Sequence, residues 1–352
     1  MTICRHFGTC GGCSYQEMPD DAYRALKRSF VVDALARHGF ADADVRDVIE
    51  VPPGTRRRAS FKAAKRDGKV LIGFHAAQSH AIVDMHECLV LTPQLFGIVV
   101  PMRELFGALL KDGGDAEIHA TDSDTGIDVA LRWQRKLDPA TTSQIVRWAQ
   151  RHHIARVTSN GEIASEFATP SVRLGKARVA LPPESFLQST REGEDALQNA
   201  MRDAVGNAKS VADLFAGLGT FTFILAEKAR VHAVEQDKKT LAALVDAARN
   251  TQGLKPITIE TRDLFKIPLS GDELTPFDAV VLDPPRAGAL AQARALAESK
   301  VKRIAYISCN ADTFARDARA LVDGGYKMGA VVPVDQFLWS SHIELAASFR
   351  RS

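Results

Sequence analysis

The chain has 352 residues, enough for about two domains, and its 45% hydrophobic and 25% charged residues are typical of a globular protein. Its net charge of +2 excludes an overall polycation, and no apolar run approaches the roughly 18 residues of a membrane-spanning helix. Cys4 and Arg5 stand where an export signal would need an apolar stretch. We therefore expect a cytoplasmic protein with reduced cysteines, without membrane association or an obligate protein partner.

The first half of the chain predicts a cysteine-rich loop, one long helix and a series of short strands. Residues 1–16 are rich in glycine and cysteine, which is typical of a loop around a bound group. Residues 20–38 have helical apolar spacing and stop at Gly39. From 46 to 181, short alternating segments predict a β-rich domain with antiparallel pairing and a helix at 139–152. Its clearest strands are expected at 70–76, 127–133, 162–167 and 177–182.

The second half, residues 182–352, predicts a Rossmann-like α/β domain. Strand-like and helix-like runs alternate there, which favours a parallel sheet with ligand chemistry at the carboxyl ends of its strands. Strands are expected at 210–216, 230–236, 256–263, 277–285 and 303–310, with helices after 216 and at 238–250, 289–299 and 312–323. Two closing strands, at 327–337 and 342–349, could pair antiparallel.

A glycine-rich turn, DLFAGLGTF, follows the first of these strands and indicates a nucleotide-like cofactor. Gly217 lies in this turn, and Glu235 ends the next strand, where an acid can hold both ribose hydroxyls. Asp263 ends the strand after that and suits an adenine contact, although each acid could also be a surface residue. Thr222 replaces the third glycine of the dinucleotide motif, so we favour S-adenosylmethionine over NAD. The turn is similar to the first motif of class I methyltransferases.

Three residues at strand ends are candidates for the chemistry. Asp283 begins a rigid Asp-Pro-Pro-Arg loop, Cys309 ends the fifth strand, and Glu344 begins the last strand. The simpler interpretations are a strand-terminating turn, a core cysteine and a surface carboxylate. Their shared position favours a thiol nucleophile and a general base. His342, two residues before Glu344, is more consistent with a structural role.

A thiol, a base and a methyl donor together suggest methylation at C5 of a pyrimidine. Thiolate addition to C6 makes C5 nucleophilic, and a base must then remove the C5 proton. Cytosine-5 RNA methyltransferases typically use a second active-site cysteine, whereas residues 89–352 contain only Cys309, which favours uracil. An amino-group methyltransferase is an alternative, because Asp-Pro-Pro resembles the loop of that group. A non-catalytic RNA-binding factor is a second alternative.

The other four cysteines have the spacing of metal ligands. Cys4-x5-Cys10-x2-Cys13 with a distant Cys88 suits zinc or an iron–sulfur cluster equally. Residues 56–69 contain seven basic residues and one acid, which indicates either a solvated face or a surface for RNA phosphates. A target uridine must be unpaired or flipped, and Phe186 could stack on it.

At these residues the chain resembles the RNA 5-methyluridine methyltransferase family, in particular its iron–sulfur branch acting on 23S ribosomal RNA. The matching segments are CRHFGTCGGCSYQ, Phe186-Leu-Gln188, DLFAGLGTF, VEQD, DPPRAG, YISCN and HIE. The resemblance implies Cys309 as nucleophile, Glu344 as base and a [4Fe-4S] cluster on Cys4, Cys10, Cys13 and Cys88. It also implies an S-adenosylmethionine pocket lined by Gln188, Phe215, Thr220, Glu235, Asp263 and Asp283. Relatives that modify tRNA also exist, so tRNA is an alternative substrate.

The resemblance further implies that the helix within residues 17–45 packs on the catalytic domain. Many relatives carry an RNA-binding OB-like barrel before the first cysteine, whereas Cys4 is almost the first residue here. We therefore expect the β-rich domain to supply RNA affinity, with Arg56, Arg58 and Lys62 as candidates. Thr220 stands where relatives often have asparagine.

Overall fold

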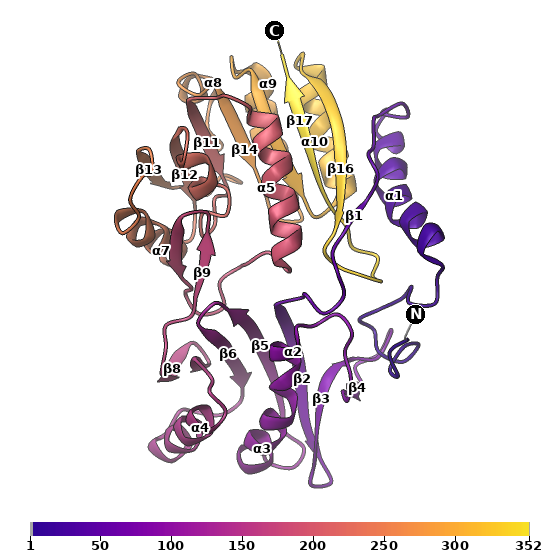
Figure 1. Ribbon diagram of the computed structural model, residues 1–352, viewed down its shortest axis with the longest axis vertical. Coiled ribbons are helices and arrows are strands. Elements are labelled where there is room, and N and C mark those ends of the chain that lie inside the picture. Colours follow the sequence, from indigo (N-terminus) through magenta and orange to yellow (C-terminus); the bar gives the residue numbers. More distant parts are fainter. Residues whose placement is uncertain (1–2, 352) are drawn as a thin grey trace.

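The computed structural model describes residues 3–351 and has two lobes, each built around one large sheet (Figure 1). The predicted loop 1–16 begins with residues 1–2, and the predicted domain 182–352 ends with residue 352. These three residues lie outside the described part of the chain. None of the helices within residues 3–351 is long and apolar enough to cross a membrane.

An eight-stranded sheet forms the core of the upper lobe in Figure 1. Its strands, in spatial order, are β1 (Ile49–Glu50), β16 (Lys327–Asp335), β17 (Glu344–Arg350), β15 (Arg303–Ser308), β14 (Ala279–Leu282), β11 (Ser210–Leu214), β12 (Arg230–Glu235) and β13 (Ile257–Thr261). The strands from β11 to β15 pair parallel, as the alternating pattern predicts. Parallel sheets need cover on both faces, which explains the almost continuous apolar sequence of β14 and β15.

Helices cover both faces of this sheet and fix its strand ends. One face packs against α5 (Arg191–Val205), α6 (Thr222–Ala226) and α7 (Lys238–Arg249). The other packs against α1 (Asp20–Arg37), α8 (Gly271–Leu274), α9 (Leu290–Glu298) and α10 (Ala311–Asp323). The helices predicted at 20–38, 238–250, 289–299 and 312–323 are confirmed, whereas α5 and α8 are not anticipated by the sequence patterns.

The last strand determines which residues meet at the sheet's ligand edge. β17 lies between β15 and β16 and is antiparallel to both. Its register pairs Leu345 with Ser308 and Glu344 with Val334. The two predicted closing strands are therefore antiparallel, and the start of β17 lies beside the end of β15.

The lower lobe contains a seven-stranded sheet. Its spatial order is β4 (Ile82–Asp84), β3 (Lys69–His75), β2 (Arg58–Arg66), β5 (Asp115–Ser123), β6 (Gly126–Trp133), β7 (Arg156–Ser159) and β8 (Glu162–Glu166). Pairing is antiparallel as expected, except between β6 and β7. The predicted helix at 139–152 is α4 (Pro139–Arg151). The sequence patterns miss the helices α2 (Pro93–Gly97) and α3 (Val99–Leu109). Proline usually interrupts a helix, but Pro101 lies in the first turn of α3, where proline is tolerated.

Two segments of the range 46–181 belong structurally to the upper lobe. β1 pairs parallel with β16. The hairpin of β9 (Ser171–Leu174) and β10 (Ala177–Ala180) packs Val172 and Val179 against Leu218 and Leu244. Their apolar side chains complete that core, so the boundary between the lobes differs from the simple division at 46 and 182.

Candidate functional site

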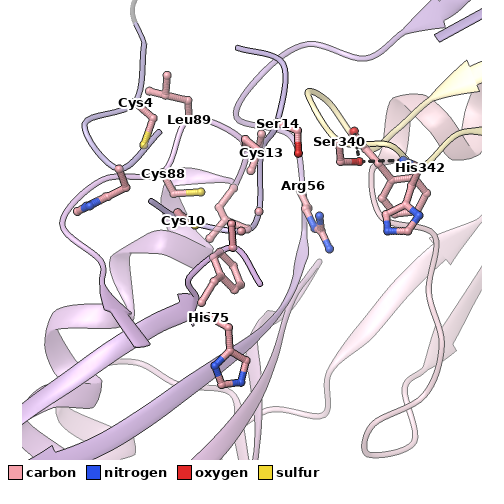
Figure 2. Close-up of a pocket in the computed structure, with 18 of the residues that line it drawn as sticks. Cys4, Cys10, Cys13, Ser14, Arg56, His75, Cys88, Leu89, Ser340 and His342 are labelled. Carbon is pink, nitrogen blue, oxygen red and sulfur yellow. Dashed lines mark hydrogen bonds between the residues drawn. The ribbon is translucent and has the colours of Figure 1, made fainter. Parts of the chain in front are cut away.

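A cleft of about 1040 Å³ contains both groups of residues that the sequence singles out. Its walls include the four N-terminal cysteines and, from the upper lobe, Gln188, Arg286, Cys309, His342 and Glu344. Phe186 and Arg56 also line it. Figure 2 shows the four cysteines on one side of this cleft, Ser340 and His342 on the other, and Arg56 between them.

Cys309 and Glu344 come together because of the register between β15 and β17. Cys309 directly follows Ser308, and Glu344 directly precedes Leu345, the partner of Ser308. Cys309 is partly exposed, whereas the Glu344 side chain is buried. The structure thus brings the two predicted catalytic residues to adjacent positions, although they are far apart in sequence.

The surroundings of this pair favour the protonated forms of both side chains in the ligand-free enzyme. Burial, with the nearby carboxyl groups of Glu344 and Asp283, raises the pKa of Cys309 to about 11, and Arg286 opposes this shift. Burial and then Asp283 raise the pKa of Glu344 to about 8, and the side chain of Gln336 opposes that shift. Three acidic groups in one desolvated crevice cannot all ionise easily, which is typical of sites that transfer protons.

Two amide side chains lie close to the two carboxyl groups. Gln336 donates from Nε2 to Oε1 of Gln188 at 2.7 Å, and Gln188 donates from Nε2 to Oδ2 of Asp283 at 3.3 Å. The Gln336 side chain also lowers the pKa of Glu344, so the four residues form one polar cluster. Gln188 and Asp283 are predicted site residues, whereas Gln336 is missed, since its only signal is a lone amide after a strand.

The glycine turn has an unusual backbone conformation. Phe215, Gly217 and Gly219 all have positive φ, at 62°, 55° and 92°. A bulky residue such as Phe215 rarely adopts this conformation, and strain of this kind concentrates at ligand sites. Gly217 N donates to Oε2 of Glu235 at 3.1 Å, so the predicted ribose acid lies against the turn.

Of two further predicted residues, Thr220 lies in the turn and Asp263 lies in the segment that packs against it through Phe265. Asp263 lies after β13, where its carboxylate accepts from Lys266 Nζ at 3.1 Å, and Lys266 helps to lower its pKa. The ring of Phe215 packs 5.4 Å from that of Phe265, centre to centre. Thr220 accepts through its backbone oxygen from Gln198 Nε2 at 3.1 Å.

Asp213 is a buried carboxyl group to which the sequence patterns assign no role. Oδ2 accepts from Thr222 Oγ1 at 2.5 Å, but Oδ1 has no hydrogen-bond partner among residues 3–351. Burial raises its pKa to about 7, and burial together with Asp213 raises that of Asp283 to about 7. An orphaned acceptor beside a second carboxyl group suits a positively charged ligand. S-adenosylmethionine carries an ammonium and a sulfonium group, so these residues fit it.

The basic run 56–69 does not form one surface. It lies on and before β2, where successive side chains point to opposite faces. Arg57 is buried against Glu194 at 2.7 Å, and Lys62 pairs with Glu117.

Within this run, Arg56 lines the cleft and Arg58 contacts Phe186, which also lines it. The guanidinium of Arg58 stacks 4.8 Å from the centre of the exposed Phe186 ring, and that of Arg56 lies 5.8 Å from the centre of the Phe337 ring. Burial and the two neighbouring arginines lower the pKa of Arg58 to about 10. An anion would relieve this repulsion.

The four N-terminal cysteines share the cleft as free thiols. Burial and the neighbouring thiols raise the pKa of Cys13 to about 11. Within residues 3–351, however, no three Cys, His, Asp or Glu side chains converge as ligands of a single metal ion. The expected metal site is therefore not shown. Four thiols remain a suitable donor set for a [4Fe-4S] cluster, in which each thiolate binds a different iron.

Comparison with known proteins identifies the family. Residues 176–351 match the family described as tRNA (Uracil-5-)-methyltransferase. The chain is 44% identical over 354 residues to an uncharacterized RNA methyltransferase of Rhizobium meliloti, covering 99% of this chain and 85% of that protein. It is 32% identical over 372 residues to the 23S rRNA (uracil(1939)-C(5))-methyltransferase RlmD of Thiobacillus denitrificans, covering 99% and 85%.

The fold agrees with this assignment. The tRNA (uracil-54, C5)-methyltransferase of Pyrococcus abyssi, solved with S-adenosyl-L-homocysteine, matches with a TM-score of 0.74. That match covers 96% of this chain and 85% of the other, and at 22% identity it concerns the fold alone. The chain therefore belongs to the RNA (uracil-5-)-methyltransferase family and is an S-adenosylmethionine-dependent RNA methyltransferase.

Proposed function

We propose that this enzyme methylates C5 of one specific uridine in 23S ribosomal RNA, with Cys309 as nucleophile and Glu344 as general base. The observation that carries the proposal is the β15–β17 register, which sets a thiol and a buried carboxyl group next to each other in one cleft. A lone buried cysteine would need no such partner. The adjacent carboxyl group is what the elimination step of this chemistry requires.

The reaction proceeds by addition, methyl transfer and elimination. The Cys309 thiol gives its proton to water, and the thiolate forms a bond to C6 of uracil, so that C5 gains the electron pair of the former double bond. C5 would then bond to the methyl group of S-adenosylmethionine as the bond from sulfur to that methyl group breaks, which would leave S-adenosylhomocysteine. Glu344 removes the C5 proton, the C5–C6 double bond re-forms, and the C6–S bond breaks to return its electrons to Cys309.

The surroundings of Cys309 must change before the first step, because its thiol is protonated at neutral pH. Arg286 lowers the pKa of Cys309, whereas Asp283 and Glu344 raise it. A cationic ligand beside Asp283 would offset its charge and so favour the thiolate. Binding of the methyl donor and activation of the nucleophile are thereby linked through Asp283.

The residues proposed to hold S-adenosylmethionine surround the glycine turn. The strained turn and the orphaned Asp213 oxygen support this location. We assign the ribose to Glu235, the adenine to the region of Asp263, and the amino-acid moiety to the region between Asp213 and Asp283. The proposed lining consists of Gln188, Phe215, Gly217, Thr220, Glu235, Asp263 and Asp283.

We propose that RNA enters the cleft past Phe186, Arg56 and Arg58. The ring of Phe186 is exposed, and base–aromatic stacking tolerates a flipped nucleotide. Arg56 and Arg58 would bind phosphates, whereas Lys62 would first have to release Glu117. The relative from Thiobacillus denitrificans favours 23S rRNA as substrate, and tRNA is the alternative. A ribosomal RNA substrate also favours a cytoplasmic location.

We further propose that Cys4, Cys10, Cys13 and Cys88 ligate a [4Fe-4S] cluster. Burial and, to a smaller extent, neighbouring thiols raise the pKa of Cys10, Cys13 and Cys88, and cluster irons would bind all four cysteines as thiolates. The test is the iron content and visible absorption of protein purified without oxygen. Cys88→Ser should lose both, whereas the matched control Cys309→Ser should retain both. Full iron content in Cys88→Ser would refute the assignment.

The test of the reaction is tritium release from RNA that carries [5-³H]uridine. Wild-type enzyme with S-adenosylmethionine should release tritium from unmodified 23S rRNA, and Cys309→Ala should release none. Release from tRNA alone would leave the chemistry intact but refute the substrate. Methyl incorporation without tritium release would point to an amino-group target and refute the mechanism.

A further inference from the structure

Lys27, in the second turn of α1, carries a fully buried ammonium group on the side of the helix that faces the sheet of the upper lobe. Its Nζ lies 2.8 Å from Oδ1 of Asp335, and both side chains are 0% exposed. A buried charge is expensive even when it is paired, and apolar residues of similar size usually replace such a pair without loss of stability. This ion pair therefore requires an explanation other than packing.

The Lys27 ammonium also binds the segment that leads to Glu344. We call residues 336–343, between β16 and β17, the base loop. Lys27 Nζ donates to the backbone oxygens of Ser340, at 3.0 Å, and His342. Two carbonyls and one carboxylate use all three donors of the ammonium group. One residue of α1 thus binds the end of β16 at Asp335 and the base loop at two further points, the last of them two residues before Glu344.

Tyr23, one turn earlier on α1, binds the same structure. Its hydroxyl donates to Oδ2 of Asp335 and accepts from the backbone N of Trp339 at 2.7 Å. Trp339 itself has a φ of 58°, which is strained for a bulky residue and persists only where the surroundings enforce it. Asp335 also accepts from the backbone N of Phe337 at 3.2 Å. The buried Lys27–Asp335–Tyr23 group is therefore the framework of the base loop.

The base loop in turn carries polar groups of the site. Gln336 donates to Gln188 and lowers the pKa of Glu344, and His342 lines the cleft. The cysteine-rich N-terminal segment also contacts this loop, because Ser14 N and Tyr15 N donate to the Trp339 carbonyl at 2.6 and 3.2 Å. A shift of the loop would move Gln336 and the first residue of β17 together.

We propose that Lys27 and Tyr23 are positioning residues that hold Glu344 in place for removal of the C5 proton. The inference rests on the proposed role of Glu344 as base. It assigns to α1 a specific step of the reaction: the C5 proton passes to the Glu344 carboxylate, the C5–C6 double bond re-forms, and the C6–S bond breaks. Thiol addition and methyl transfer precede this step and do not need the base.

This order of steps gives the proposal a signature that simple destabilisation lacks. If the base is misplaced, methyl transfer continues while the methylated RNA stays bonded to Cys309. Variants of the two residues should therefore accumulate a denaturant-resistant protein–RNA complex. A small misplacement of a catalytic group from a distant substitution can cost up to about 100-fold in rate.

The experiment measures how fast this complex forms and decays in a single turnover on unmodified 23S rRNA. The variants are Lys27→Met and Tyr23→Phe. Glu344→Gln is the comparator for a lost base. Tyr326→Phe is the matched control, because it removes a buried hydroxyl that donates to Val301 O at 2.6 Å, away from the base loop. Decay should slow by about 10- to 100-fold in Lys27→Met and by less in Tyr23→Phe, with unchanged methyl transfer, and Tyr326→Phe should match wild type.

The outcomes separate the inference from the function on which it rests. If Glu344→Gln does not accumulate the complex, the proposed base is wrong. If Glu344→Gln accumulates it while Tyr23→Phe and Lys27→Met decay like wild type, the positioning role is wrong. Should Lys27→Met not fold, Tyr23→Phe decides alone, because it keeps the ion pair. Equal losses of methyl transfer and decay in Tyr23→Phe would indicate a purely structural residue and also overturn the proposal.

Discussion

Replacement of Asp213 by asparagine should stabilise the ligand-free enzyme in a way that depends on pH. The Asp213 side chain is 0% exposed, and burial raises its pKa from 3.8 to about 7. A carboxyl group whose pKa is higher in the folded state favours folding only while it is protonated. That stability is fully present below the unfolded pKa and is lost as pH rises towards 7. Asparagine has no charge, so it removes this loss.

The magnitude follows from the two pKa values. Between pH 5 and pH 8, the ionisation of Asp213 should lower the free energy of unfolding of the wild type by roughly 2–3 kcal/mol, at about 1.4 kcal/mol per unit of differential titration. The difference in unfolding free energy between Asp213→Asn and wild type should grow by this amount over the same range. Any constant cost of the new amide cancels in this comparison.

The assay is urea denaturation of both proteins at pH 5 and pH 8 without ligand. Asp237→Asn is the control, because the Asp237 carboxyl has a lowered pKa and stays ionised at both values. S-adenosylmethionine binding should be lost in Asp213→Asn, since the orphaned anionic acceptor is gone. The same stability difference at pH 5 and pH 8 would refute the view that Asp213 is a strained, buried acid.

Three further predictions concern other parts of the site. Glu344→Gln should let iodoacetamide alkylate Cys309 several-fold faster at pH 8, because the substitution removes a charge that raises the thiol pKa. Mass spectrometry measures the rate, and unchanged or slower alkylation would contradict this prediction. Gly219→Ala should cost about 1–3 kcal/mol in urea denaturation, since its φ is +92° and the new Cβ would lie 2.7 Å from an aromatic ring; wild-type stability would show that the turn can relax. Arg57→Met should cost about 3–5 kcal/mol by leaving Glu194 buried and unpaired, and Arg57→Met with Glu194→Leu should recover most of it; an equally unstable double variant would refute the pairing argument.

Much of the upper lobe was predictable because its signals are local. A parallel sheet with covered faces gives apolar strands of regular spacing, and the residue that follows each strand lies at the ligand edge. For this reason Glu235, Asp263, Asp283 and Cys309 could be singled out from the sequence, and the structure brings them to one edge.

The features that were missed depend on contacts between distant residues or on ambiguous local patterns. The sequence alone indicates that Lys27 is an ordinary surface lysine of an amphipathic helix. Its partner Asp335 is more than 300 residues away, so no local pattern reveals the ion pair. Gln336 is a single amide with no motif. The basic run at 56–69 suggested one surface, but a strand alternates its side chains, so Arg57 is buried. The four cysteines were found from spacing, yet spacing does not determine their geometry.

The most direct test of the central claim uses 23S rRNA in which uridine is replaced by 5-fluorouridine. Fluorine at C5 cannot be removed by a base, so the reaction should stop after methyl transfer with the RNA bonded to the enzyme. After digestion with trypsin and nuclease, mass spectrometry should find the peptide of residues 304–316 with a fluorinated, methylated nucleotide on Cys309. No adduct, or an adduct on another residue, would contradict the mechanism.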